Sequence, residues 1–136
     1  MPLKITKDSI DLGIITTDAD AALKFYRDTL GLAPDGEMEM PGGGHMTRLA
    51  CGTTTIKIVV NAKEPRATSA PGGIGGSTGY RYFTISVSNL EAATQECSDA
   101  GYTVVVKPTE IRAGITISII EDPDGNWVEL LQMDAG

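Results

Sequence analysis

Four polar residues on strand-like segments have side chains suited to acid–base chemistry: Asp11, Lys57, Tyr82 and Glu129. A carboxylate such as Glu129 can remove a proton next to a carbonyl group. An ammonium or phenol such as Lys57 or Tyr82 can stabilise the enolate that forms. The same residues also fit a solvated sheet face, on which a Lys and an Asp make an ordinary cross-strand pair. The elements that carry the four residues decide between these interpretations.

Alternation along these segments predicts that the four side chains share one surface. Successive side chains of a strand point to opposite faces. In segment 54–61 the aliphatic residues at even positions make one face and leave Lys57 and Val59 on the other. Beside the polar four, the same alternation places large apolar groups: Ile15, Val59, Trp127 and Leu131. Sheet faces open to water rarely display so many, so we expect a partly enclosed pocket.

Four residues are candidate contacts for a bound molecule. Trp127 offers an aromatic surface for a flat or apolar ligand, and Val59 and Thr84 fall on the same predicted face. The single histidine, His45, follows the PGGG turn. Two interpretations of His45 stay open, a solvated turn residue or a group that contacts the ligand or takes part in acid–base chemistry.

The elements that carry these residues occur as a repeat. The segments IDLGIITTDADAALKFYRDTLGL and YFTISVSNLEAATQECSDAGY each run from a strand into a helix that stops at a glycine. We predict helices over about 19–30, with Asp18 as N-cap, and 90–100, with Ser88 and Glu91 as a capping box. Three strands follow each helix, at about 35–40, 45–51 and 54–61 and at about 103–107, 115–121 and 127–133. The chain is therefore predicted to be α+β, with each half a βαβββ module.

The length of 136 residues suits one domain. We expect the two modules, about 1–61 and 80–136, to be joined by a linker or flap at about 62–79, which is rich in Gly and Pro. The GGIGG in this segment lacks both a following GK[ST] and a strand-to-helix junction. A nucleotide-binding loop is therefore not favoured.

Composition narrows the classes of partner. A hydrophobic fraction of 41% with 21% charged residues is ordinary for a soluble globular chain, and no apolar run approaches a membrane span. The net charge of −7 argues against nucleic acid as a partner. The first residues contain no apolar leader, and the two cysteines have no metal-binding spacing. We therefore expect a cytoplasmic protein with reduced thiols, and neither a membrane nor a nucleic acid as partner.

Three motifs resemble the vicinal oxygen chelate superfamily, which includes glyoxalases, bleomycin resistance proteins and extradiol dioxygenases. They are DLGIITTDADAALKFYRDTLGL, ISVSNLEAA and EDPDGNWVELLQ, and the resemblance covers nearly the whole chain. It implies that the two βαβββ modules form a cup-shaped mixed β-sheet with the helices outside. It also implies a small organic molecule as ligand and a homodimer as assembly.

Metal-dependent members of this superfamily bind a divalent cation through four inward side chains, usually His and Glu. Carried over by position, these ligands fall on Asp11, Lys57, Tyr82 and Glu129. An ammonium at Lys57 repels a cation, and a neutral phenol at Tyr82 is a poor ligand near neutral pH. We therefore expect neither a bound metal nor another cofactor.

The resemblance implies three alternative functions. The first is a metal-independent isomerase, epimerase or cyclase that binds a small organic molecule in the cup, with catalytic groups Lys57, Glu129, Tyr82 and Asp11. The second is an antibiotic-sequestering protein of the bleomycin-resistance type. The third is a metal-dependent lyase or dioxygenase. The sequence leaves open whether the protein is an enzyme.

Overall fold

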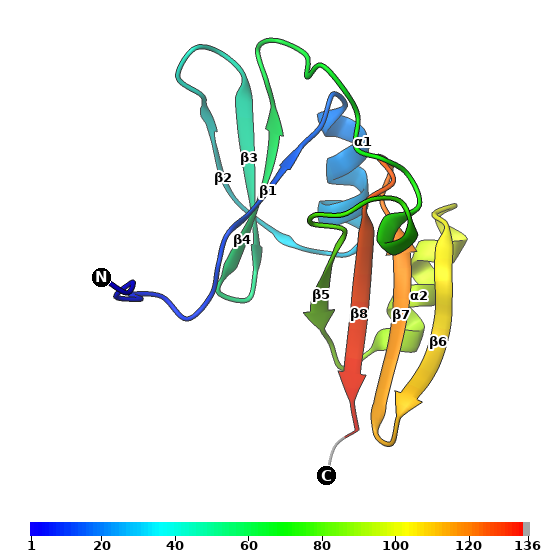
Figure 1. Cartoon of the computed structure of the whole chain (residues 1–136). Helices are drawn as coiled ribbons and strands as arrows, with labels where there is room; N and C mark the ends of the chain where they lie inside the picture. Colours follow the sequence, from blue (N-terminus) through cyan, green and yellow to red (C-terminus); the bar gives the residue numbers. More distant parts are fainter. Residues whose placement is uncertain (135–136) are drawn as a thin grey trace. The chain divides into compact units, whose positions relative to one another are not determined.

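The computed structural model describes residues 1–134, which form an α+β fold of two compact units (Figure 1). Unit 1 spans Met1–Arg66 and unit 2 spans Ala67–Gly136. Each unit contains one four-stranded mixed sheet and the helical segment of a βαβββ module. The predicted repeat and the α+β class are confirmed. The Gly/Pro-rich segment from residue 67 onward groups with unit 2.

Unit 1 begins with a short strand and a helix that Asp18 caps. Its side chain accepts a hydrogen bond from the Ala21 amide at 3.0 Å, as predicted. The sheet order is β1-β4-β3-β2, with β1 parallel to β4 and the other neighbours antiparallel. The elements are β1 (Leu12–Ile15), α1 (Ala19–Leu23), η1 (Lys24–Thr29), β2 (Ala33–Glu39), β3 (His45–Cys51) and β4 (Thr54–Val60).

The two faces of this sheet differ in burial. Leu49, Ile56 and Ile58 are almost completely buried, as are Phe25 and Tyr26 of η1, and α1 contacts β4. Neighbouring ladder partners share a face, so the opposite face can be read from the pairs of β1, β3 and β4. We call it the open face of unit 1, and it carries Gly13, Ile15, Met46, Arg48, Thr55, Lys57 and Val59. Asp11 directly precedes β1 and contacts this face through Thr55 and Lys57.

Unit 2 repeats this arrangement with a longer helix. Its sheet order is β5-β8-β7-β6, with β5 parallel to β8. Figure 1 shows α2 and the short η2 turn on opposite faces of this sheet. The elements are η2 (Gly73–Gly75), β5 (Tyr82–Ser86), α2 (Leu90–Asp99), β6 (Val104–Arg112), β7 (Ile115–Glu121) and β8 (Trp127–Met133).

The predicted capping box at the start of α2 is wrong. Asn89, not Ser88, is the N-cap residue, and its side chain makes no capping bond. The amide of Leu90 instead donates to Oε1 of Gln132 at 2.8 Å. A side chain from β8 therefore satisfies a helix-end donor that the local sequence was expected to satisfy.

A buried hydroxyl pair identifies the helix-facing side of the second sheet. Thr94 Oγ1 of α2 lies 2.8 Å from Ser118 Oγ of β7, and Thr94 also donates to the Leu90 carbonyl at 2.7 Å. Ser118 pairs with Leu130, so the helix covers the side of β8 that carries Val128 and Leu130. The opposite side, which we call the open face of unit 2, carries Tyr82, Thr84, Ser86, Ile117, Ile119, Trp127, Glu129 and Leu131.

The turn before β8 is organised by one buried carboxylate. The side chain of Asp122 accepts hydrogen bonds from the amides of Asp124 and Asn126 at 2.9 and 2.8 Å, and from the Asn126 side chain at 2.9 Å. The Asp122–Gly125 run is therefore a structural turn, as expected from the sequence. It sets the point at which β8 begins with Trp127.

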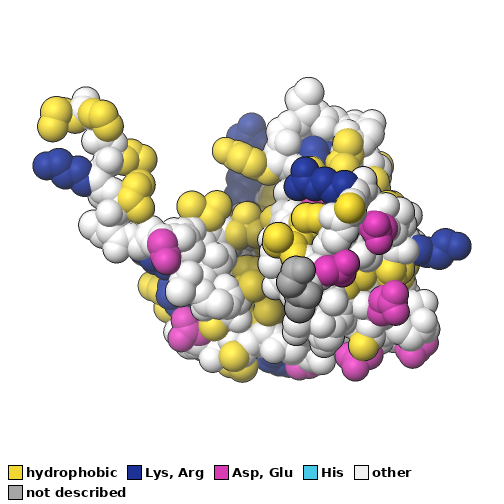
Figure 2. Space-filling model, turned by 90° about the horizontal axis from the view of Figure 1, so that it is seen from below, with side chains coloured by type: hydrophobic (Ala, Val, Ile, Leu, Met, Phe, Trp, Pro, Cys, Tyr) yellow, Lys and Arg dark blue, Asp and Glu magenta, His cyan; other side chains and the backbone are white. Residues whose placement is uncertain are grey.

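Apolar side chains are exposed along the N-terminal segment (Figure 2). They belong to Met1, Leu3 and Ile5, each more than two-thirds exposed. They therefore add little to the buried core of unit 1. Among residues 1–134, no helix is long and apolar enough to cross a membrane.

We expect Thr94→Val to destabilise the protein by about 1 to 3 kcal/mol, because it leaves the buried Ser118 hydroxyl without its partner at the same side-chain volume. The double variant Thr94→Val/Ser118→Ala should lose less than Thr94→Val alone, since both polar groups are removed. Urea denaturation measures the three free energies of unfolding. A double variant less stable than Thr94→Val would contradict the assignment.

Candidate functional site

On the open face of unit 2, Glu129 is held by a neighbouring hydroxyl. Thr84 Oγ1 donates to Glu129 Oε1 at 2.7 Å, across directly paired positions of the parallel strands β5 and β8. A hydrogen bond between paired strands fixes the rotamer of the carboxylate. Thr84, expected only to contact a ligand, therefore positions the side chain expected to act as base.

Tyr82 and Trp127 form the next pair along the same two strands. Tyr82 is half exposed on this face. The indole Nε1 of Trp127 donates to Glu121 Oε1 at 3.4 Å, and the main chain of Gly73 lies against the ring. A Cβ atom built on Gly73 would come within 2.0 Å of Trp127 Cδ2. The η2 turn thus covers part of the aromatic surface that was expected to receive a ligand.

Arg81 ties this covering segment to the start of β5. Its Nε donates to the Gly73 carbonyl at 2.7 Å, and its Nη2 donates to the Ala70 carbonyl at 2.5 Å. Gly76 packs closely as well, because a Cβ there would meet the Pro71 carbonyl and the Arg81 guanidinium. Local composition suggested only a linker or flap, since the anchoring arginine lies outside the Gly/Pro-rich run.

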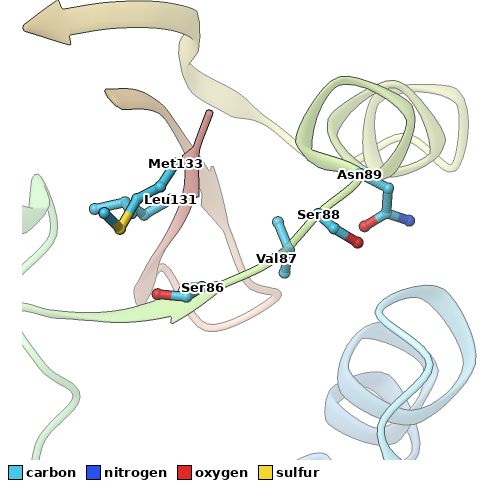
Figure 3. A pocket seen from close by; sticks show the side chains of 6 residues that line it. All are labelled: Ser86, Val87, Ser88, Asn89, Leu131 and Met133. Atoms are coloured by element: carbon cyan, nitrogen blue, oxygen red, sulfur yellow. The ribbon is translucent and has the colours of Figure 1, made fainter. Parts of the chain in front are cut away.

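A shallow, open depression of about 580 Å³ begins two residues along the sheet from Thr84 and Glu129, and neither of these residues lines it. Ser86 and Leu131 are a ladder pair on the same face, two residues beyond Thr84 and Glu129. Figure 3 shows Leu131 and Met133 extending from β8 and Ser86 at the end of β5. The mixture of methyl groups and hydroxyls is typical of a site for a small organic molecule. Its lining residues are Ser86, Val87, Ser88, Asn89, Leu131 and Met133.

Beside the open face of unit 1, Asp11 binds two lysines. Lys7 Nζ lies 2.7 Å from its Oδ1, and Lys57 Nζ lies 3.6 Å from its Oδ2. The Thr55 amide also donates to Oδ1 at 3.4 Å. The pKa of Asp11 is lowered, chiefly by the hydrogen bond from Lys7. Asp11 is therefore suited to hold cations rather than to accept a proton.

Lys57 and Glu129 occupy equivalent positions of their sheets. Lys57 pairs with Gly13 as Glu129 pairs with Thr84. Val59, only 6% exposed, lies two residues further along β4 on the same face. The predicted salt bridge between Lys57 and Glu129 would need one residue from each unit, and it stays a prediction.

Arg48 is a residue of this face that the sequence analysis missed. It lies on β3 and pairs with Lys57 of the adjacent strand β4, and its Nη2 donates to Thr55 Oγ1 at 3.5 Å. The alternation of segment 45–51 contained the signal, because Met46, Arg48 and Ala50 fall on one side of that strand.

His45 is placed apart from Lys57 and Val59. Its ladder partner is Val60, so it falls on the other face of the sheet. Its Nδ1 lies 2.7 Å from Glu39 Oε1, and its Nε2 lies 3.4 Å from Glu37 Oε1. The hydrogen bond with Glu39 is the main cause that raises the pKa of His45. The structure thus does not bring His45 together with the other candidate ligand contacts.

The donor chemistry of the four expected positions does not fit a divalent cation. Lys57 supplies an ammonium, and Asp11 is already bound to lysines. Tyr82 supplies a phenol, so Glu129 is the one customary ligand among the four expected positions that is not bound to a lysine. Within that part of the chain, no group of three or more His, Cys, Asp or Glu residues could hold a metal ion.

Comparison with known sequences decides the family. The sequence signature of the Glyoxalase/Bleomycin resistance protein/Dioxygenase superfamily matches residues 9–130. The chain belongs to this superfamily. A curated relative from Synechocystis sp., a probable lactoylglutathione lyase, is 26% identical over 117 residues, which are 85% of this chain and 87% of the relative.

Solved structures of this superfamily share the fold. A glyoxalase family protein from Bacillus cereus matches 98% of this chain and 97% of its own, with a TM-score of 0.82 and 14% identity. Glyoxalase I from Zea mays matches 92% of this chain, with a TM-score of 0.75 and 19% identity. The chain corresponds to 44% of the maize protein.

We expect Gly73→Ala to displace the η2 turn from Trp127, because the new Cβ would collide with the indole and the φ of +52° is unfavourable for alanine. The tryptophan emission should shift to the red, and acrylamide should quench it more strongly. Gly75→Ala is the matched control, since a Cβ there meets no atom within 4 Å. An unchanged emission spectrum of Gly73→Ala would contradict the contact.

The single histidine should titrate above its ordinary pKa in an NMR experiment. Glu39→Gln should lower the midpoint, and Glu37→Gln should lower it less, because Glu39 makes the shorter contact. With the folded-state pKa raised, the stabilisation is fully present below the ordinary imidazole pKa. It is lost as the pH rises through the folded-state value. A midpoint that Glu39→Gln leaves unchanged would rule out this pair.

Proposed function

We propose that this protein binds a small organic molecule on the open face of unit 2 and transfers a proton with Glu129 as base, without a metal ion. The observation that carries the proposal is the 2.7 Å bond from Thr84 to Glu129. It holds a carboxylate in place on the same face as the open depression of about 580 Å³. A positioned carboxylate near an organic ligand is the minimal requirement for general-base catalysis.

The reaction class is isomerisation, epimerisation or cyclisation of a carbonyl compound. Glu129 removes a proton from the carbon next to the carbonyl group, and the electron pair of that bond forms an enolate. The Tyr82 phenol, on the same face and strand as Thr84, donates a hydrogen bond to the enolate oxygen. Return of the proton from Glu129 to a different atom completes an isomerisation, and its return to the opposite face of the same carbon completes an epimerisation. In a cyclisation, the enolate carbon attacks a second carbonyl group of the same molecule, and the oxygen of that group takes the proton from Glu129. That Lys57 and Asp11 take part as well stays a prediction from the sequence.

Sequestration of a drug-like molecule is the second candidate. The depression supports it, because Leu131 and the two-thirds exposed Met133 offer apolar surface beside the hydroxyls of Ser86 and Ser88. In this function Glu129 contacts the ligand but moves no proton. The two candidates differ in whether a bound carbonyl compound exchanges its acidic proton.

A metal-dependent lyase or dioxygenase is the third candidate. The name of the Synechocystis relative, a probable lactoylglutathione lyase, supports it. The ammonium of Lys57 at one of the four expected ligand positions opposes it, since a cation there would be repelled. No step through a metal is therefore assigned.

The location, assembly and partners of the protein are proposed from its sequence. We propose a cytoplasmic homodimer with no cofactor and with neither nucleic acid nor membrane as partner. The support for the last point is the net charge of −7, which disfavours polyanions and anionic lipid surfaces. Sedimentation analysis of the purified chain tests the dimer.

We expect the protein to catalyse hydrogen–deuterium exchange at the carbon next to a carbonyl group in a panel of small keto acids and ketones, followed by proton NMR. Glu129→Gln should reduce the rate about 100-fold or more, and the exposed Glu110→Gln should leave it unchanged. Exchange should survive dialysis against EDTA. Exchange lost with EDTA would favour the metal-dependent candidate, and binding without exchange would favour sequestration.

A further inference from the structure

Two cations lie directly opposite each other on the open face of unit 1. Arg48 of β3 and Lys57 of β4 are ladder partners, and their side chains are 35% and 30% exposed. Like charges at opposed positions of a sheet destabilise it. Such a pair is unexpected in a chain with a net charge of −7. A bound anion would reduce the repulsion between the two side chains.

The carboxylates of the described residues neutralise this pair only in part. Asp11 Oδ2 is 3.6 Å from Lys57 Nζ, but Oδ1 of the same carboxylate is bound to Lys7 at 2.7 Å. Asp35 Oδ2 is 3.9 Å from Arg48 Nη2, which is too long for a hydrogen bond. No carboxylate in residues 1–134 bridges Arg48 and Lys57.

Space for a ligand group lies beside Lys57. Its partner on β1 is Gly13, and a Cβ built there meets no atom within 4 Å. Unit 2 has the side chain of Thr84 at the equivalent position. The first sheet therefore lacks a side chain where the second sheet has one, next to an incompletely neutralised charge.

An apolar row runs beside the charged row. Ile15, Val59 and Met46 are ladder partners on the same face. Ile15 and Val59 lie two residues after Gly13 and Lys57, and Met46 lies two residues before Arg48 on the antiparallel strand β3. Ile15 is 48% exposed, so part of this row is accessible. A molecule that spans both rows needs an anionic end and an apolar body.

We propose that Arg48 and Lys57 bind the anionic group of a small organic molecule, a carboxylate or a phosphate, whose apolar part lies on Ile15 and Met46. The guanidinium of Arg48 presents two parallel donors to such a group, and Lys57 adds a compact charge. This inference goes beyond the proposed function, because it gives the open face of unit 1 a ligand site of its own. Its residues are separate from the proposed base.

The test is an amide NMR titration of the full chain with 2-naphthoate, phenyl phosphate, inorganic phosphate and the neutral 2-naphthamide. Both organic anions should shift the amides of Gly13, Lys57 and Val59, and 2-naphthamide should bind about tenfold more weakly than 2-naphthoate. The organic anion that binds more tightly shows whether the site prefers a carboxylate or a phosphate. Equal binding of naphthoate and naphthamide, or shifts confined to unit 2, would overturn the proposal.

Two variants test the contribution of the Arg48 charge and that of the empty space beside Gly13 separately. Arg48→Met should weaken 2-naphthoate binding about tenfold, and Lys107→Met on the exposed part of β6 should have no effect. Gly13→Val keeps both charges, suits a strand and fills the space, so it should weaken binding as well. Normal affinity in both folded variants would overturn the proposal. Deuterium exchange by Glu129 is measured separately, so anion binding without exchange contradicts the proposed function and leaves this inference standing.

Discussion

The parallel pairing of the first and fourth strands of each module is the constraint on which both open faces depend. β1 pairs with β4 and β5 with β8, and each pair brings together residues more than 40 positions apart. Side chains alternate with a period of two, so a slip of one residue would turn Glu129 under α2 and expose Leu130. Burial of Val128 and Leu130 opposes such a slip, because both side chains are almost completely buried on the side of the sheet that α2 covers.

The two modules use the same ladder for different chemistry. At equivalent positions, unit 1 has a glycine beside a lysine and unit 2 has a threonine beside a glutamate. The first pair leaves space next to a positive charge, and the second fills the space and directs a hydroxyl to a negative charge. The two units thus present the same ladder positions with side chains of opposite charge.

Structural features that depend on the local residue pattern could be predicted from the sequence. Features that depend on contacts between residues far apart in the chain could not. Alternation correctly placed Ile56 and Val128 on the helix sides, and Asp18 was recognised as a cap from its position before the first helix. The cap of α2 was missed because it comes from Gln132, far along the chain. The cover on Trp127 was missed for the same reason, since it depends on Arg81 folding the Gly-rich segment back over the indole.

Arg48 and His45 show a different limit. Both lie on β3, whose bounds at His45–Cys51 agree with the sequence prediction, so the period of that strand already assigned them to opposite faces. The histidine was considered for its chemistry and not for its register. Where residue type and strand register disagree, register determines which groups can meet a common ligand.

The bond from Gln132 to the start of α2 links the order of folding to the order of synthesis. The acceptor follows the helix by more than 30 residues, so a growing chain exposes the whole of α2 before the group that satisfies its first amide exists. Isolated helices of this length are marginal in water. The second module is therefore expected to stabilise the start of this helix only after β8 has been synthesised and has paired with β5.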